Sequence, residues 1–361
     1  MKLTSVLVGL CLTAQLSGCA TQQDTQWYRG NTHTHTVICG HADSPPDLVA
    51  AWYHDRGYHF LILSEHNHFI DPATVNLPKP KREDFLLIPG VELTGSSYIH
   101  TTSMNVTGVP PWKFSHKDKS KIIQNHVDET KKLGGEPILN HPNFGTGASA
   151  DHMLPVKGLH LFELFNGHPH VHSHGKEDHP STEVMWDDML TRGKLIYGVS
   201  SDDAHHFQTI APDKSNPGRG WVMVRAEELT PDAITRALLH GDFYASNGVF
   251  LKVCEPGTKT YRIEVDTEKT EAELAGNPLL RGKKIEQGKE GYRIEFIGPK
   301  GKVLTDFNGT AAIAAVNPDL AYVRARVTYT RKHPDADGYE EYYAWSQPVF
   351  NDGRAHDVHE H

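Results

Sequence analysis

The stretch NTHTHTVICGHADS at residues 31–44 concentrates three histidines, His33, His35 and His41, in one short segment. The chain contains 25 histidines, more than its 13 phenylalanines or its 13 tyrosines. Imidazole is the commonest metal ligand in proteins, and it can gain or lose a proton near neutral pH. In an extended strand, a spacing of two residues places His33 and His35 on the same face. The segment is therefore a candidate for metal binding or for proton transfer.

Further imidazole and carboxylate groups recur along the chain, each close to the end of a short apolar run. Such groups follow the runs HFLILS, FLLIPGV, EPILN and LIYGVSS, and another histidine opens a segment near residue 100. With the first segment, they form the candidate set His33, His35, His41, Glu65, His66, Glu92, His100, His141, Asp203 and His205.

The same apolar runs indicate which elements must position these residues. Between residue 30 and about residue 245, strand-like runs alternate with helical patterns such as KSKIIQNHVDETKKLGG and TPDAITRALLHGD. This alternation predicts parallel β/α units, arranged either as an open sheet or as a barrel. In such folds the active site lies at the carboxyl ends of the strands, because the loops there vary above a rigid scaffold. We therefore expect the candidate residues to converge at one edge of the sheet.

Each motif alone has an ordinary explanation. A His-x-His pair can be two surface histidines on a strand, and the histidine of NHP can be a hydrogen-bonded core residue. Their joint placement favours a metal site instead, since so many buried polar groups could not satisfy one another without a cation. Nitrogen and oxygen ligands without a thiolate suit zinc, manganese or iron rather than a structural zinc site built from cysteines.

The motifs appear in the order found in the PHP (polymerase and histidinol phosphatase) metallophosphoesterases, which the chain resembles from residue 30 to about residue 245. HTHT with the later GHA resembles the first motif, and SEHN resembles the second, where an aspartate usually stands at the position of Glu65. The remaining motifs of the family are matched by PGVE, NHP and SDDAH. In the last of these, the family's spacing of two residues to His205 selects Asp203 rather than Asp202. The metal ligands that the resemblance implies are His33, His35, His41, His66, Glu92, His100, His141, Asp203 and His205.

The resemblance also implies a fold and a reaction. The expected fold is α/β, a distorted (β/α)7 barrel that holds about two to three divalent metal ions. The expected reaction is metal-assisted hydrolysis of a small-molecule ester, most often a phosphate ester, with Asp203, His205 and Glu65 as the residues that carry catalysis. Within the family, DDAHHF, GDFYASNGV and the C-terminal β segments resemble the branch that includes carbaryl hydrolase.

Two other functions stay open. The same site could hydrolyse a carboxylic or carbamic ester, because polarising a carbonyl requires the same Lewis acid and hydroxide. The chain could also be a metal-binding lipoprotein without catalysis. Its net charge of −9 disfavours a nucleic-acid backbone as a partner.

Beyond about residue 250 the sequence pattern changes. Short β-type runs are separated by turn residues, without a sustained helical period, which predicts an antiparallel β-sandwich-like domain. We therefore divide the chain into a metallohydrolase domain at residues 20–250, a β-rich domain at residues 251–350 and a flexible tail at residues 351–361.

Two further features lie outside the ligand set. The stretch GHPHVHSH contains His168, His170, His172 and His174, and a solvated loop is favoured over a lid or a substrate-contacting loop. Arg219, in NPGRGW, could hold an anionic substrate group or form a structural ion pair.

The N-terminus reads as a targeting segment. Lys2 and the apolar run SVLVGLCLTAQL precede LSGC, which resembles the lipobox of bacterial lipoproteins, although a plain signal peptide is the alternative. We expect residues 1–19 to form a lipoprotein signal, with Cys19 lipidated and holding the protein at the cell envelope, in the periplasm or on the outer membrane in a Gram-negative host. Cys39 and Cys254 are expected to be unpaired thiols rather than a disulfide.

Overall fold

The computed structural model of the chain describes residues 25–334 and 336–350, which include every predicted metal ligand. The signal predicted at residues 1–19, the lipidation of Cys19 and the tail predicted at residues 351–361 lie outside these residues and stay predictions. In the described part of the chain, no helix combines the length and the apolar character that a membrane span requires.

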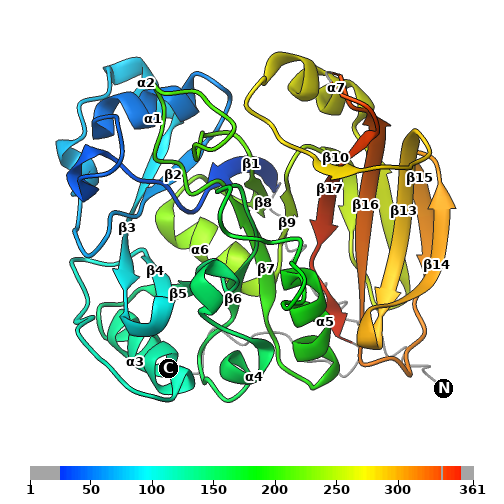
Figure 1. Cartoon of the computed structure of the whole chain (residues 1–361), viewed down its shortest axis with the longest axis horizontal. Coiled ribbons are helices and arrows are strands. Elements are labelled where there is room, and N and C mark those ends of the chain that lie inside the picture. Colours follow the sequence, from blue (N-terminus) through cyan, green and yellow to red (C-terminus); the bar gives the residue numbers. More distant parts are fainter. Residues whose placement is uncertain (1–24, 335, 351–361) are drawn as a thin grey trace, which may run out of the picture.

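The first half of the molecule is an α/β unit, coloured from blue to green in Figure 1, which carries all of the predicted ligands. Its strands are β1 (Gln26–Asn31), β2 (Phe60–Leu63), β3 (Leu86–Thr94), β4 (His100–Met104), β5 (Glu136–Leu139), β6 (Leu161–Asn166), β7 (Tyr197–Ser201), β8 (Trp221–Ala226) and β9 (Phe243–Ser246). Its helices are α1 (Pro46–His54), α2 (Lys79–Asp84), α3 (Lys119–Lys132), α4 (Ala150–Met153), α5 (Thr182–Thr191) and α6 (Pro231–His240).

Helix α6 shows how the local sequence sets the bounds of an element. The Thr230 side chain accepts a hydrogen bond from the Ala233 amide at 3.3 Å, and Pro231 occupies the first helical turn, where no amide partner is needed. Gly241 ends the helix with φ of 75°, a left-handed conformation that glycine adopts without strain. The helix predicted from TPDAITRALLHGD is thereby confirmed.

Strands β1 to β7 pair in sequence order and form a curled row. The pairs β1–β2, β2–β3, β5–β6 and β6–β7 are parallel, as the β/α alternation predicts. Strand β4, however, runs antiparallel to both β3 and β5. The expectation of uniformly parallel units is wrong there, because the few residues between β3 and β4 are too short for a helical crossover.

The two ends of this row meet beside the predicted site. Thr34, beyond β1, forms a parallel bridge with Ala204, beyond β7. The His35 amide donates to the Ala204 carbonyl at 2.9 Å, and the Asp203 amide donates to the His33 carbonyl at 3.1 Å. The segments that carry both histidines and the Asp203 carboxylate are therefore joined directly by backbone hydrogen bonds.

The large sheet continues from the first half into the second. Strand β8 pairs antiparallel with β1, β9 with β8, and β17 (Tyr339–Ser346) with β9. The remaining elements are β10 (Leu251–Glu255), β11 (Thr260–Val265), α7 (Thr267–Gly276), β12 (Lys283–Ile285), β13 (Gly291–Gly298), β14 (Lys302–Asn308), β15 (Ala311–Ala315), β16 (Tyr322–Lys332) and β18 (Val349–Phe350). Because one sheet spans both halves, the division into residues 20–250 and 251–350 stays a prediction.

The C-terminal half is antiparallel, as predicted, and its two sheets face each other (Figure 1). The three-stranded sheet β10–β11–β15 packs on the large sheet through contacts such as Tyr261 against Phe296, whose ring centroids are 5.6 Å apart. The sequence pattern did not predict helix α7. The Asp266 side chain caps this helix by accepting from the Lys269 amide at 3.0 Å, and so few of its residues are buried that it lacks an apolar period.

Candidate metal centre

The segment that follows β1 brings two imidazoles together. His33 and His35 are both buried, and their Nε2 atoms lie 3.0 Å apart. The bridge between Thr34 and Ala204 keeps this segment extended, so that both rings project to the same side. The pairing expected from the His-x-His spacing is what the structure contains.

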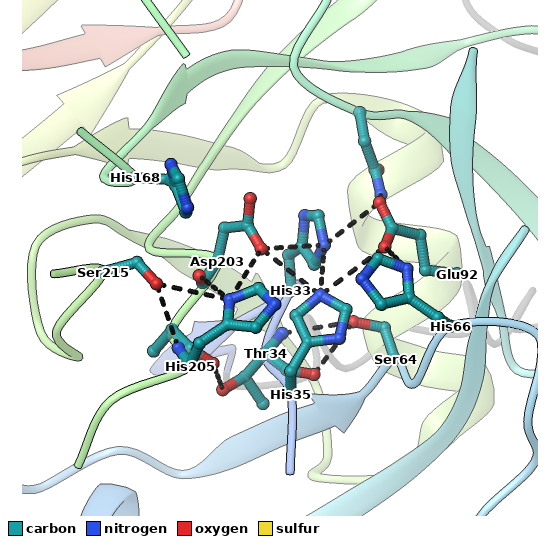
Figure 2. A network of polar contacts seen from close by, with 12 residues as sticks. His33, Thr34, His35, Ser64, His66, Glu92, His168, Asp203, His205 and Ser215 are labelled. Atoms are coloured by element: carbon teal, nitrogen blue, oxygen red, sulfur yellow. Dashed lines mark hydrogen bonds and ion pairs between the residues drawn. The ribbon is translucent and has the colours of Figure 1, made fainter. Parts of the chain in front are cut away.

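Two carboxylates complete a tight group around these rings, and Figure 2 shows the side chains pointing toward one another. Asp203 Oδ1 lies 3.3 Å from the Nε2 atom of His33 and 3.3 Å from that of His35. The Glu92 oxygens lie 3.4 Å and 3.5 Å from the same two nitrogens. Four ligands held about 2.1 Å from a tetrahedral zinc ion lie about 3.4 Å from one another. The distances from the two histidine nitrogens to each other and to the carboxylate oxygens therefore match those around a metal position.

Glu92, on β3, also faces a second group of histidines. Its Oε1 atom lies 3.1 Å from His100 Nδ1 and 3.2 Å from His141 Nε2. His100 is the first residue of β4, and His141 follows β5 with an unusual positive φ of 22°. One carboxylate is thus shared between two groups of imidazoles, an arrangement suited to a ligand that bridges two ions.

A third group lies on the solvent side of the first. The ring of His41 stacks 5.1 Å from that of His66 and 4.7 Å from that of His205. His66 Nδ1 lies 2.7 Å from Glu92 Oε2, and the rings of both His66 and His205 stack on His35. The structure thereby brings all nine predicted ligands together, although their role as ligands stays a prediction.

The histidines around Asp203 and Glu92 lower the pKa values of these two carboxyl groups. Burial alone would raise the pKa of Asp203, but the charge of His33 and a hydrogen bond with His35 hold that pKa well below its usual value. Burial likewise opposes ionisation of Glu92, and the nearby imidazoles of His66, His33 and His100 hold its pKa well below its usual value. The neighbouring imidazoles therefore favour the charged form of both carboxylates.

Two buried nitrogens fit divalent cations. His205 Nε2 and His141 Nδ1 are buried, and each lacks a hydrogen-bond partner among residues 25–334 and 336–350. A buried polar atom without a partner costs free energy that a bound cation would recover. The donor set of imidazoles and carboxylates matches zinc, manganese or iron.

Glu65 lies behind the ligands rather than on the cavity wall. Its carboxylate is fully buried, accepts a hydrogen bond from the Thr36 amide at 2.7 Å, and lies 3.5 Å from His35 Nδ1. From there it can hold the His35 ring with its Nε2 atom toward the other ligands. The geometry gives Glu65 the place of a positioning residue.

Glu163, on β6, is a residue that sequence reasoning missed. Its Oε1 atom lies 2.7 Å from His33 Nδ1, and its Oε2 atom accepts from the His141 amide at 2.7 Å. One carboxylate thus supports ligands of two groups. The available signal was a single acidic residue within the apolar run LFELFN, since a buried charge in such a run requires a partner.

The ligands open onto a cavity of about 580 Å³. Its wall includes Phe144, Val171 and several histidines that are not predicted ligands. In the part of the chain that the structure describes, the wall contains neither lysine nor arginine. An anionic substrate would therefore depend on bound cations and imidazoles for charge neutralisation.

The histidine-rich loop contributes to this wall. His168 and the exposed His170 line the cavity, whereas the exposed His172 and His174 are not among its described lining residues. The Asn143 side chain donates to the carbonyls of His172 and of Pro180, both at 3.0 Å, and so ties the two ends of the loop. The favoured prediction of a solvated loop therefore holds only for His172 and His174. His168 and His170 are placed to contact a substrate. Burial lowers the pKa of His168 to about 4.

Arg219 serves neither of its two predicted roles. Its buried guanidinium donates to the carbonyls of Lys214 at 2.6 Å and Leu279 at 3.0 Å, and to Asn216 Oδ1 at 2.9 Å. It is absent from the described cavity wall. Arg219 therefore ties the loop after β7 to the C-terminal half, and no acidic residue among residues 25–334 and 336–350 forms an ion pair with it.

The prediction of two unpaired thiols is confirmed. Cys39 is half-buried and lies on the cavity wall, and Cys254 is buried on β10. Burial raises the pKa of both thiols, and that of Cys254 rises to about 12.

Comparisons with known proteins give matches among solved structures. Neither a protein-family model nor a curated protein matches this chain. One solved structure is a two-domain protein from Bacteroides vulgatus that contains a predicted PHP-like metal-dependent phosphoesterase. It is 14% identical, has a TM-score of 0.45, and the match covers 89% of this chain and 95% of that chain. Another, from Bifidobacterium adolescentis, has the proposed identity of a metal-dependent phosphoesterase. It is 12% identical, has a TM-score of 0.36, and the match covers 52% of this chain and 89% of that chain. Because both matches are distant, the function proposed below is argued from the residues of this chain.

Proposed function

We propose that this chain is a metal-dependent hydrolase of the PHP type that cleaves phosphate monoesters of small molecules. The observation that carries the proposal is the group formed by His33, His35, Glu92 and Asp203. The two histidine Nε2 atoms lie 3.0 Å from each other and 3.3–3.5 Å from the carboxylate oxygens. The order of the motifs supports the PHP assignment, as does the curled row of β1 to β7, which we interpret as a distorted (β/α)7 barrel.

The chemistry divides between the ions and the protein. When bound, about two to three divalent ions would lower the pKa of a coordinated water and stabilise charge on the ester oxygens. Glu163 holds the imidazole of His33 in place, and the Glu65 carboxylate lies 3.5 Å from His35 Nδ1, close enough to orient that ring. His168 Nδ1 accepts from the His170 amide at 3.2 Å, which leaves its proton on Nε2 and makes that nitrogen a donor for a substrate oxygen.

A carboxylic or carbamic ester is the second candidate substrate. Clustered cations stabilise phosphoryl charge directly, which favours phosphate. The cavity wall without lysine or arginine favours an uncharged ester instead, as does the resemblance to the carbaryl-hydrolase branch. A paired assay separates the two.

We expect the protein, supplied with manganese or zinc, to hydrolyse p-nitrophenyl phosphate faster than p-nitrophenyl acetate. EDTA should abolish this turnover, and inorganic phosphate should inhibit it competitively, because both effects require metal ions at the reacting group. Release of p-nitrophenolate measures both reactions.

Cleavage of the acetate alone, without inhibition by phosphate, would show that the phosphatase assignment is wrong and that the ester hydrolase takes its place. Bound metal without turnover of either compound would favour the third possibility, a metal-binding lipoprotein without catalysis.

We further propose that lipid on Cys19 holds the enzyme at the cell envelope, facing the periplasm or the cell exterior. The lipobox-like LSGC supports this location. Stable anchoring requires more than one acyl chain, and a lipidated N-terminal cysteine supplies both diacylglycerol and an N-acyl chain. In fractionated cells, the wild type should partition with membranes and Cys19→Ser should not. Equal recovery of both proteins in the soluble fraction would contradict the anchor.

A further inference from the structure

We propose that Cys39 is an additional metal ligand, whose thiolate forms a metal position at the mouth of the cavity together with His41 and His205. This inference rests on the proposed function, because it assigns a new donor to the same metal centre. The ligand atoms of these three residues all lie within 4.8 Å of one another. All three residues also line the cavity.

The local chain path brings the thiol to the histidines. Residues Val37–Cys39 form a single helical turn, capped by Thr36, whose side chain accepts from the Ile38 amide at 3.3 Å. Gly40 then takes a left-handed φ of 82°, which reverses the chain and returns His41 to the cavity. His41 Nδ1 bonds to the Cys39 carbonyl at 3.2 Å, so that its proton lies on Nδ1 and its Nε2 lone pair is free to bind a metal.

His205 provides an independent indication of a ligand. Its ring is only 6% exposed, and its Nδ1 atom bonds to the Asp203 carbonyl at 3.0 Å. This bond fixes the proton on Nδ1 and leaves a lone pair on Nε2. In the described part of the chain, that buried Nε2 atom has no hydrogen-bond partner. A cation beside the Cys39 sulfur would supply one.

The two cysteines of the described residues lie in different surroundings. Cys39 is half-buried and lines the cavity, as do His41 and His205. Cys254, by contrast, is buried among the apolar residues of the C-terminal core. The chain therefore offers one cysteine placed to bind a metal and one that serves as a matched control.

A thiolate changes which ion the position prefers. Sulfur is a soft donor that selects zinc over manganese or magnesium. Imidazoles and carboxylates discriminate less strongly among the candidate metals. We therefore infer that the outer position is a zinc position, while the group around Glu92 and Asp203 can take a different divalent ion.

Cobalt(II) spectroscopy of the full chain tests this inference. Cobalt bound by a thiolate shows a near-ultraviolet charge-transfer band from sulfur, and tetrahedral cobalt absorbs in the visible range whatever its ligands. We expect the near-ultraviolet band in the wild type and in Cys254→Ala, and its loss in Cys39→Ser. Cys39→Ser keeps Cys254 and Cys254→Ala keeps Cys39, so a band lost only in Cys39→Ser is assigned to Cys39. Zinc should also bind about tenfold or more weakly at the outer position of Cys39→Ser, with a smaller change for manganese.

Visible cobalt absorption without a sulfur band in the wild type, or an equal band in Cys39→Ser, would overturn the assignment of Cys39 and leave the hydrolase proposal intact. A wild-type chain that binds no cobalt would instead contradict the proposed function itself.

Discussion

Asp203→Asn is expected to lower turnover by about three orders of magnitude and to reduce the bound metal by about one equivalent. Asp203 Oδ1 lies 3.3 Å from the Nε2 atoms of both His33 and His35, so its charge belongs to the innermost group of donors. Asparagine keeps the shape of the side chain but removes that charge. It also tolerates the positive φ of 50° at this position, so the backbone is not strained. Elemental analysis and ester turnover measure the result.

Asp202→Asn is the matched control, one residue away and also buried. The Asp202 carboxylate turns away from the ligands and accepts from Asn31 Nδ2 and Tyr53 OH, both at 2.7 Å. Its other oxygen accepts from the Gly218 amide. An asparagine amide facing that amide would destabilise the fold by about 1–3 kcal/mol. We therefore expect a lower Tm with wild-type metal content. Full metal content and turnover in Asp203→Asn would remove Asp203 from the proposed ligand set.

The parts of the fold that could be predicted are those whose sequence carries a strong local signal. Helix α6 has a capping threonine, an N-terminal proline and a C-terminal glycine, and its pattern alone gave its position. The antiparallel direction of β4 has no such signal, because it depends only on how few residues separate it from β3. Helix α7 was missed because Thr270 and Leu274 are the only residues that it buries, too few for a period.

The candidate site likewise contains residues that could be predicted from the sequence and residues that could not. Residues at strand ends, such as His33 and Asp203, could be grouped from sequence because parallel strands bring their carboxyl ends to one edge. The residues behind them could not, because their roles depend on contacts between strands that are distant in the sequence. The contact of Glu163 with His33 joins residues 130 positions apart, and no spacing rule relates the two. Arg219 was misread for the same reason, since its partners are carbonyl groups that sequence does not reveal.

Glu163 is the strongest case for a residue that acts through its neighbours. Its Oε1 atom lies 2.7 Å from His33 Nδ1 and accepts from Ser201 Oγ at 2.5 Å. Its Oε2 atom accepts from the His141 amide at 2.7 Å and from Asn166 Nδ2 at 2.8 Å. The carboxylate therefore keeps a proton on His33 Nδ1, which leaves the Nε2 lone pair facing the other ligands.

Glu163→Gln should reverse that tautomer. The His141 amide and Asn166 Nδ2 both donate to the position of Oε2, so the oxygen of the glutamine amide must take that position. The new NH₂ group then faces His33 Nδ1 and donates to it. The proton of His33 then lies on Nε2, the nitrogen that a metal needs, and we expect metal affinity to fall about 10- to 100-fold. Turnover should fall at limiting metal and recover partly as metal is added, which a loss of folding would not do. Nitrogen-15 shifts of the His33 ring report the tautomer directly. Ser201→Ala, which removes a different partner of the same oxygen, should keep the wild-type tautomer. An unchanged tautomer and metal affinity in Glu163→Gln would show that the carboxylate does not position His33.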